Sequence, residues 1–160
     1  KTRKEYKIAL EQNITIEWGK TLNLTIENEK MKGKVKITKI SEDDNLITGE
    51  VAGTPIANVK FEIYDDSGKL VDTLITKTDG IAISKDLVVG KYIVKEKETG
   101  EYYEINENDF EVEITKNGEV VGLTISNKSK TPPPEKPKEE TPKIEVPPIE
   151  PIKKLPVTGY

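Results

Sequence analysis

Apolar and polar residues alternate with a period of two in several short segments between Gly33 and Lys128, and no segment holds a helical period for long. Three of these segments place their apolar side chains at every second position: Val35 and Ile37; Val59, Phe61 and Ile63; and Tyr92 and Val94. Successive side chains of a β-strand point to opposite faces, so this alternation is typical of half-buried antiparallel strands. We therefore predict an all-β sandwich over residues 33–128.

Turn-forming residues separate the predicted strands. Clusters rich in Asp, Asn and Gly occupy residues 65–68, 78–80 and 116–119. The last cluster contains Asn117-Gly118, a dipeptide that favours a two-residue turn between paired strands. We therefore expect three tight turns, the last of them within a hairpin.

Composition excludes several classes of function. The chain has 160 residues, of which 34% are apolar, so it supports one modest core. A net charge of −4 without a basic stripe argues against a nucleic-acid partner. The absence of cysteine and histidine removes disulfides, thiol catalysis and the commonest soft-metal ligands. The acidic clusters at residues 42–44 and 65–66 lack the spacing of a calcium loop. We expect no enzymatic activity, cofactor or metal.

A proline-rich tail follows the predicted sandwich. Nine of the ten prolines lie between Pro132 and Pro156, interleaved with Glu and Lys. Such a composition favours an extended, disordered spacer with a reach of about 80 Å. We assign residues 129–154 to this linker.

The first thirty residues resemble the end of the sandwich segment. Leu24-Thr25-Ile26-Glu27-Asn28 matches Leu123-Thr124-Ile125-Ser126-Asn127 at an offset of 99, and Gly19 and Gly118 keep the same offset. A period near one hundred residues indicates tandem domains. Residues 1–30 are then the C-terminal remnant of a preceding repeat, and two or three strands without their partners are not expected to be stable alone.

Three polar residues occupy positions that the alternation assigns to the buried face. Lys39 follows the apolar positions of the first segment, Glu96 those of the third, and Asn127 those of residues 123–125. Each could instead lie at the end of its strand with its polar head in water. The alternation alone leaves both interpretations open.

At the family level, the chain resembles the Cna B-type, or SpaA-like, repeat of Gram-positive adhesins and pilins. The resemblance covers residues 33–128 and lies in five segments: 33–39, 56–65, 78–80, 90–96 and 125–127. It implies an Ig-like or prealbumin-like β-sandwich. It also implies a spontaneous intramolecular isopeptide bond between Lys39 and Asn127, assisted by Glu96. The proline that usually follows the family's glutamate is missing, and Glu98 shares the parity of Glu96, so the assisting glutamate stays open between these two.

The chemistry of such a bond accounts for these residue types. An apolar site disfavours the charged forms of lysine and glutamate. A neutral Lys39 amine could then attack the Asn127 carboxamide while a protonated Glu96 transfers protons and ammonia leaves. Closing the chain between residues 39 and 127 would stabilise the fold by roughly 4–5 kcal/mol, as a long-range disulfide does.

The end of the chain resembles a sorting signal. Leu155-Pro156-Val157-Thr158-Gly159 is similar to the LPxTG motif of wall-anchored surface proteins. The resemblance implies that a sortase recognises Leu155, Pro156, Thr158 and Gly159, cleaves after Thr158, and joins the chain to a peptidoglycan cross-bridge or to a pilin amine. The chain stops at Tyr160 and its only methionine is Met31, so we expect a slice of a longer precursor located in the cell wall, on the extracellular surface of a Gram-positive bacterium.

Three functions agree with these features. The favoured one is a structural stalk module of an anchored adhesin. The alternative is a minor or basal pilin subunit, although the chain contains no Trp/Tyr-Pro-Lys pilin motif. In a third interpretation the module itself binds host matrix, for which the sequence identifies no apolar patch; a host matrix partner would otherwise bind regions outside this chain.

Overall fold

The computed structural model describes residues 5–133, and every regular element in this part of the chain is a β-strand. The strands are β1 (Lys32–Ser41), β2 (Lys60–Asp65), β3 (Leu70–Ile75), β4 (Ile81–Ile83), β5 (Leu87–Val88), β6 (Gly90–Glu98), β7 (Asp109–Ile114) and β8 (Val120–Asn127). The prediction of an all-β fold is therefore confirmed. Between residues 5 and 133, the structure contains no helix of the length and apolarity needed to cross a membrane.

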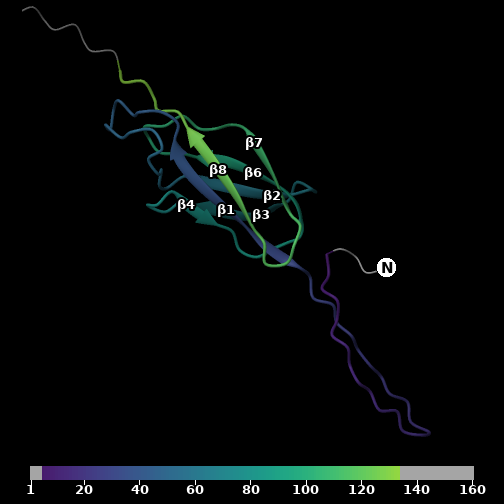
Figure 1. Cartoon of the computed structure of the whole chain (residues 1–160). Helices are drawn as coiled ribbons and strands as arrows, with labels where there is room; N and C mark the ends of the chain where they lie inside the picture. The colour runs from purple at the N-terminus through teal and green to yellow at the C-terminus, as the bar shows by residue number, and fades with distance from the viewer. Residues whose placement is uncertain (1–4, 134–160) are drawn as a thin grey trace, which may run out of the picture.

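The strands form two sheets that face each other (Figure 1). In the first sheet β1 pairs with β4 and β5 in antiparallel fashion and with β8 in parallel, from Lys34↔Val120 to Ser41↔Asn127. The second sheet has the order β3-β2-β6-β7 and is antiparallel throughout. The sequence predicted antiparallel strands. The β1–β8 pair departs from this prediction and is parallel, because the first and last strands of the domain lie side by side and run in the same direction.

The apolar face predicted from the alternation forms the core between the sheets. Val35 and Ile37 of β1, Phe61 and Ile63 of β2, and Val94 of β6 are fully buried. Side chains at the intervening positions of these strands are partly or wholly exposed. Burial of this single cluster, at about 25 cal/mol per Å² of apolar surface, is the main source of stability of the sandwich.

The three predicted turns are present, with positive φ angles at Gly68, Gly80 and Gly118. At Gly80 the φ of 70° is combined with close packing, since a Cβ atom there would lie 2.4 Å from the carbonyl oxygen of Lys39. The expected hairpin at residues 116–119 is wrong, because β7 pairs with β6 and β8 pairs with β1. The turn therefore carries the chain from one sheet to the other, which lets both strands turn their apolar faces to the core.

A β-bulge interrupts the pairing of β2 with β6. Phe61 lies opposite Glu96, whereas the preceding Lys60 lies opposite Glu98, so no residue of β2 lies opposite Lys97 in the strand pairing. An extra residue in one strand reverses the direction of the side chains beyond it. Glu96 therefore points into the core, while Glu98 points outward beside Lys60.

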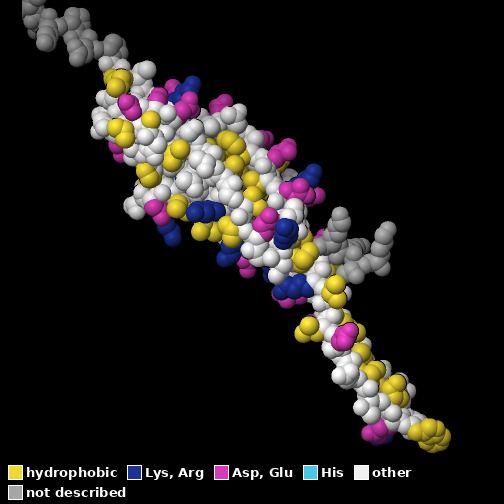
Figure 2. Space-filling model, in the orientation of Figure 1, with side chains coloured by type: hydrophobic (Ala, Val, Ile, Leu, Met, Phe, Trp, Pro, Cys, Tyr) yellow, Lys and Arg dark blue, Asp and Glu magenta, His cyan; other side chains and the backbone are white. Residues whose placement is uncertain are grey.

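Residues 5–31 form an extended arm that projects from the sandwich (Figure 1). The arm folds back on itself through the bridge Tyr6↔Lys30 and a turn closed by the Lys20 amide and the Glu17 carbonyl. Its apolar side chains are exposed, and Figure 2 shows them along its length. Ile26 is 54% exposed, whereas Ile125, its counterpart at the offset of 99, is 1% exposed.

Candidate functional site: a buried lysine, glutamate and asparagine

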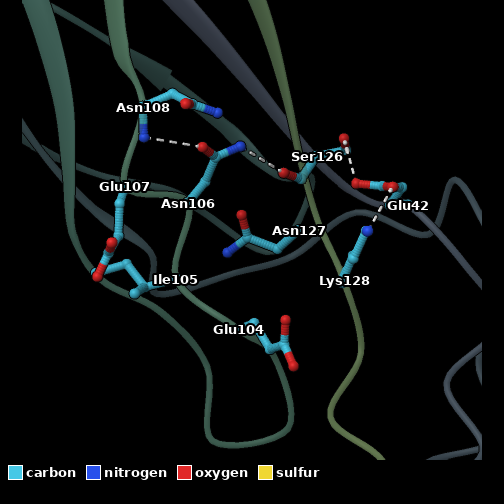
Figure 3. A pocket seen from close by; sticks show the side chains of 9 residues that line it. All are labelled: Glu42, Glu104, Ile105, Asn106, Glu107, Asn108, Ser126, Asn127 and Lys128. Carbon is cyan, nitrogen blue, oxygen red and sulfur yellow. Dashed lines mark hydrogen bonds and ion pairs between the residues drawn. The ribbon is translucent and has the colours of Figure 1, made fainter.

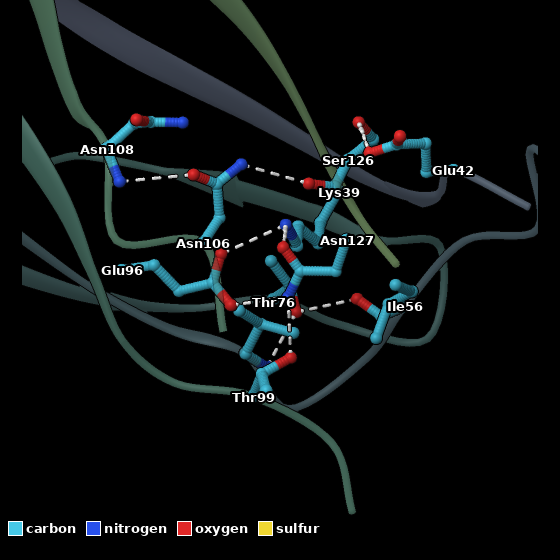
Figure 4. Close-up of polar contacts among 11 residues, drawn as sticks. Lys39, Glu42, Ile56, Thr76, Glu96, Thr99, Asn106, Asn108, Ser126 and Asn127 are labelled. Carbon is cyan, nitrogen blue, oxygen red and sulfur yellow. Dashed lines mark hydrogen bonds and ion pairs between the residues drawn. The ribbon is translucent and has the colours of Figure 1, made fainter. Parts of the chain in front are cut away.

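The structure brings Lys39, Glu96 and Asn127 together at one end of the core (Figure 4). Lys39 and Asn127 come from the neighbouring parallel strands β1 and β8, and Glu96 comes from β6 in the facing sheet. Lys39 is 0% exposed, Asn127 2% and Glu96 5%. The alternative placement, with polar heads in water at the strand ends, is therefore wrong for all three residues.

Each member of this cluster contacts the other two. The Lys39 Nζ donates a hydrogen bond to Asn127 Oδ1 and lies 3.0 Å from Glu96 Oε2. The Asn127 Nδ2 donates to Glu96 Oε1 at 2.5 Å. One carboxylate oxygen therefore faces the lysine amine and the other faces the amide nitrogen.

The surroundings of Lys39 disfavour its positive charge. Burial lowers the pKa of the Lys39 ammonium, and the hydrogen bond and charge of Glu96 oppose part of this shift. The ring of Phe61 lies 5.9 Å from Nζ and adds a weak attraction for the cation. An ion pair buried to this degree carries a desolvation penalty of several kcal/mol per ion, which the mutual attraction repays only with good geometry.

Glu98 is excluded from the cluster by the bulge. Its carboxylate is exposed and accepts a hydrogen bond from Lys60 Nζ at 2.8 Å. The shared parity of Glu96 and Glu98 in the sequence is broken because Lys97 is an additional residue between them. Of these two candidates, only Glu96 reaches Lys39 and Asn127.

Thr99 also contacts the cluster, and it is not among the residues that the sequence indicates. Asn127 Nδ2 donates a second hydrogen bond, of 2.8 Å, to Thr99 Oγ1. Strict alternation places an odd-numbered residue of this segment on the outer face, and the bulge returns Thr99 to the inner one. Only a sequence signal for the bulge could have predicted this contact of Thr99. The residues around Lys97 contain no such signal.

Two backbone hydrogen bonds hold Lys39 at the edge of β1 that faces away from β8. Its amide donates to the Gly80 carbonyl at 2.8 Å, and its carbonyl accepts from the Ile56 amide at 3.0 Å. Thr76 in turn donates its hydroxyl to the Ile56 carbonyl at 2.8 Å. The backbone that carries the Lys39 amine therefore has little freedom to move.

A surface pocket of about 320 Å³ adjoins the cluster at Asn127, one of its lining residues (Figure 3). Its lining is mostly polar and includes Asn127, Glu42, Glu104 and Glu107. On its wall, Asn106 Nδ2 donates to the Ser126 carbonyl at 3.1 Å and so ties the loop before β7 to the end of β8. Asn127 is the member of the cluster that lines this pocket, and its side chain is almost fully buried.

The remaining sequence-based candidates are outside this region. Leu155, Pro156, Thr158 and Gly159 lie beyond the described residues, as does the proline-rich segment from residue 134 onward. In residues 5–133 no group of three or more acidic side chains is placed to hold a metal ion.

Comparison with known proteins identifies the fold family. Residues 33–129 match the SpaA family, described as a prealbumin-like fold domain. The match begins at the second residue of β1 and ends two residues after Asn127, so it includes every strand and the whole buried cluster.

Related proteins are surface proteins and pilins. The chain is 33% identical over 81 residues to the trypsin-resistant surface T6 protein of Streptococcus pyogenes, covering 51% of this chain and 15% of that protein. It is 33% identical over 99 residues to the collagen adhesin of Staphylococcus aureus, covering 53% of this chain and 8% of the adhesin. Among solved structures, it superposes on GBS52, the minor pilin of Streptococcus agalactiae, with a TM-score of 0.52 and 28% identity, covering 70% of this chain and 51% of the pilin.

The chain spans less than a sixth of these two surface proteins, so the likeness concerns one module of each. The family match covers more than half of the chain and agrees with the observed sheets. This chain therefore belongs to the SpaA family of prealbumin-like domains, the structural modules of Gram-positive pilins and adhesins.

Proposed function

We propose that this chain is a structural stalk module of a sortase-anchored surface protein, and that an isopeptide bond between Lys39 and Asn127 stabilises it. The observation that supports the bond best is the position of Glu96, whose two oxygens bridge the amine and the amide nitrogen at 3.0 and 2.5 Å. A carboxyl group in this position can accept a proton from one nitrogen and deliver a proton to the other.

The proposed reaction begins with proton transfer from the Lys39 ammonium to Glu96, which leaves a neutral amine. Burial favours this step because it lowers the pKa of the Lys39 ammonium. Nζ then bonds to Cγ of Asn127. The carboxyl group of Glu96 then rotates so that its protonated oxygen faces Nδ2 and its unprotonated oxygen faces Nζ. The attacking nitrogen gives one proton to the unprotonated oxygen, and the protonated oxygen gives its proton to Nδ2.

The bond between Cγ and Nδ2 then breaks, and the nitrogen leaves as ammonia while Glu96 remains protonated. One amine and one carboxamide become one secondary amide and one ammonia, without an external reagent. The pocket above Asn127 provides the exit. Because the reaction occurs once within the molecule, it involves no turnover and the protein is not an enzyme.

Intact-mass measurement of the folded protein tests this proposal. We expect a mass lower than the sequence mass by one ammonia, and a branched peptide joining Lys39 to Asn127 after digestion. Glu96→Ala should have the full sequence mass because the proton relay is lost. Glu98→Ala is the matched control and should still lose ammonia, since its carboxylate faces Lys60. A wild-type protein of full mass whose Lys39 reacts with an amine reagent would disprove the bond.

We further propose that sortase recognises residues 155–159 and joins the chain to a peptidoglycan cross-bridge through Thr158. The motif and the proline-rich spacer before it support this assignment. The surface and adhesin relatives support a location in the cell wall of a Gram-positive bacterium. Any host matrix partner would bind regions outside this chain.

A minor or basal pilin subunit is the second candidate, favoured by the likeness to a minor pilin. The amine to which sortase joins Thr158 distinguishes the two functions. In a stalk protein, sortase would join Thr158 to a cross-bridge peptide only. In a pilin subunit, sortase would also form a product in which Thr158 is bonded to a lysine of a backbone pilin.

The arm at residues 5–31 supports a tandem arrangement in which residues 1–30 complete a preceding module. Its exposed Leu22, Leu24 and Ile26 stand at the offset of 99 from Val121, Leu123 and Ile125, the apolar residues that β8 turns to the core. In the described module β8 is covered by β1 and by the opposite sheet. The equivalent strands of a preceding module would cover the arm in the same way.

A further inference from the structure

We propose that Thr99 is a second catalytic residue of the cross-linking reaction, acting on the nitrogen that leaves as ammonia. This role rests on the proposed isopeptide bond. Thr99 Oγ1 lies 2.8 Å from Asn127 Nδ2, the atom whose bond to carbon breaks. Glu96 Oε1 lies on the same nitrogen at 2.5 Å.

Asn127 Nδ2 needs a second hydrogen-bond acceptor besides Glu96 during the reaction. In the unreacted state Nδ2 has two N–H groups, and Glu96 and Thr99 accept one each. When the Glu96 acid group hands its proton to Nδ2, its oxygen acts as a donor and no longer accepts from that nitrogen. The Thr99 hydroxyl oxygen is then the acceptor that stays in place.

The hydrogen bond to Thr99 should also strengthen as the reaction proceeds. Nδ2 gains positive charge while the third proton arrives, and charge-assisted hydrogen bonds are roughly twice as strong as neutral ones. A contact that is stronger in the transition state than in the ground state accelerates the chemical step. Thr99 thus stabilises the leaving group, whereas Glu96 moves the protons.

The bulge at Lys97 is what makes this contact available. Without the additional residue, Thr99 would follow the outward parity of the odd-numbered positions of β6. With it, Glu98 turns to solvent and Thr99, half-buried at the end of the strand, turns to the amide. The bulge therefore allows Glu96 and Thr99, three positions apart in the sequence, to contact the same nitrogen, Asn127 Nδ2.

The test is the time course of ammonia loss, followed by intact mass during cell-free synthesis at low temperature. Thr99→Val keeps the shape and removes the oxygen, so the loss of ammonia should slow by roughly three- to tenfold, the value of one hydrogen bond. Thr99→Ser restores the oxygen and should react at nearly the wild-type rate. Thr124→Val removes an exposed hydroxyl from β8 and is the matched control.

A second comparison separates this role from a structural one. In the Asn127→Ala background no amide is present, so adding Thr99→Val should leave the melting temperature unchanged. Reaction of Thr99→Val at the wild-type rate, or of Thr99→Ser as slowly as Thr99→Val, would overturn the role of Thr99 and leave the cross-link intact. A wild-type chain that never loses ammonia would overturn the cross-link itself, and this role with it.

Discussion

At the scale of single residues, the unusual feature is a lysine with no exposed surface in a protein of modest core. A buried ion pair is weak evidence of a stabilising role, because apolar residues of similar volume often serve as well or better. A buried ionisable group with a lowered pKa and a specific charged partner is more typical of sites where chemistry occurs. These two observations support the proposal that Lys39, Glu96 and Asn127 are reactants and not a salt bridge kept for stability.

The lowered pKa of Lys39 predicts how pH affects a variant that cannot react. Asn127→Ala keeps Lys39 and Glu96 and removes the carbonyl group. Between the lowered folded pKa and the ordinary value of 10.5, the unfolded chain binds more protons than the folded chain. The free energy of unfolding should therefore increase with pH in the window just below 10.5.

Urea unfolding of Asn127→Ala at several alkaline pH values would measure this increase. The double variant Lys39→Met/Asn127→Ala lacks the titrating group and serves as the control. An equal pH dependence in both variants would show that Lys39 is not responsible.

At the scale of strands, the sequence predicts the parts that obey a simple period and fails where the period is broken. Alternation and turn chemistry predict the buried faces of β1, β2 and β6 and the three turns. For Lys39 and Asn127 the alternation indicates the inward face but does not distinguish it from a strand end with the polar head in water. The bulge at Lys97 has no signal of its own, so Glu98 and Thr99 could not be assigned. Pairing partners are equally hidden, because an alternation says which face is buried but not which strand lies beside it.

The arm should be the least protected part of residues 5–133 against hydrogen exchange. Few of its backbone amides are paired, and its apolar side chains lack a covering sheet. We expect amide hydrogens of residues 5–31 to exchange quickly and those of β1, β2, β6 and β8 to exchange slowly, as in the most stable part of a fold. Hydrogen exchange followed by mass spectrometry provides this comparison directly. Slow exchange across the arm, equal to that of β1, would instead make it an integral part of one larger fold.

At the scale of the whole molecule, a single covalent bond would join the first strand to the last and close a loop of 88 residues. Lys39→Met removes the amine with little change in volume. Loss of the loop closure should lower the free energy of unfolding by roughly 4–5 kcal/mol, and the melting temperature by roughly 20–30 °C for a domain of this size. Calorimetry and the rate of trypsin digestion would measure both effects. A Lys39→Met protein as stable as the wild type would contradict the expected stabilisation.

The sorting motif gives a prediction that is independent of the cross-link. A sortase of matching specificity should cleave after Thr158 and join the new end to a supplied amine peptide, because the proline-rich composition before the motif favours an extended chain. Replacing Leu155 or Thr158 by Ala should abolish the product, while Val157→Ala, at the variable position of the motif, should not. Joining of Thr158→Ala at the wild-type level would remove the sorting interpretation.

The parallel pairing of β1 with β8 also determines how the domain responds to pulling. The arm enters at the start of β1 and the tail leaves after the end of β8, at opposite ends of the sandwich (Figure 1). Tension between the two ends therefore slides one strand along the other, and the hydrogen bonds from Lys34 to Ser41 resist together instead of opening one at a time. With Lys39 bonded to Asn127, the tension would pass directly from β1 to the end of β8, and the 87 residues between them would bear none of it.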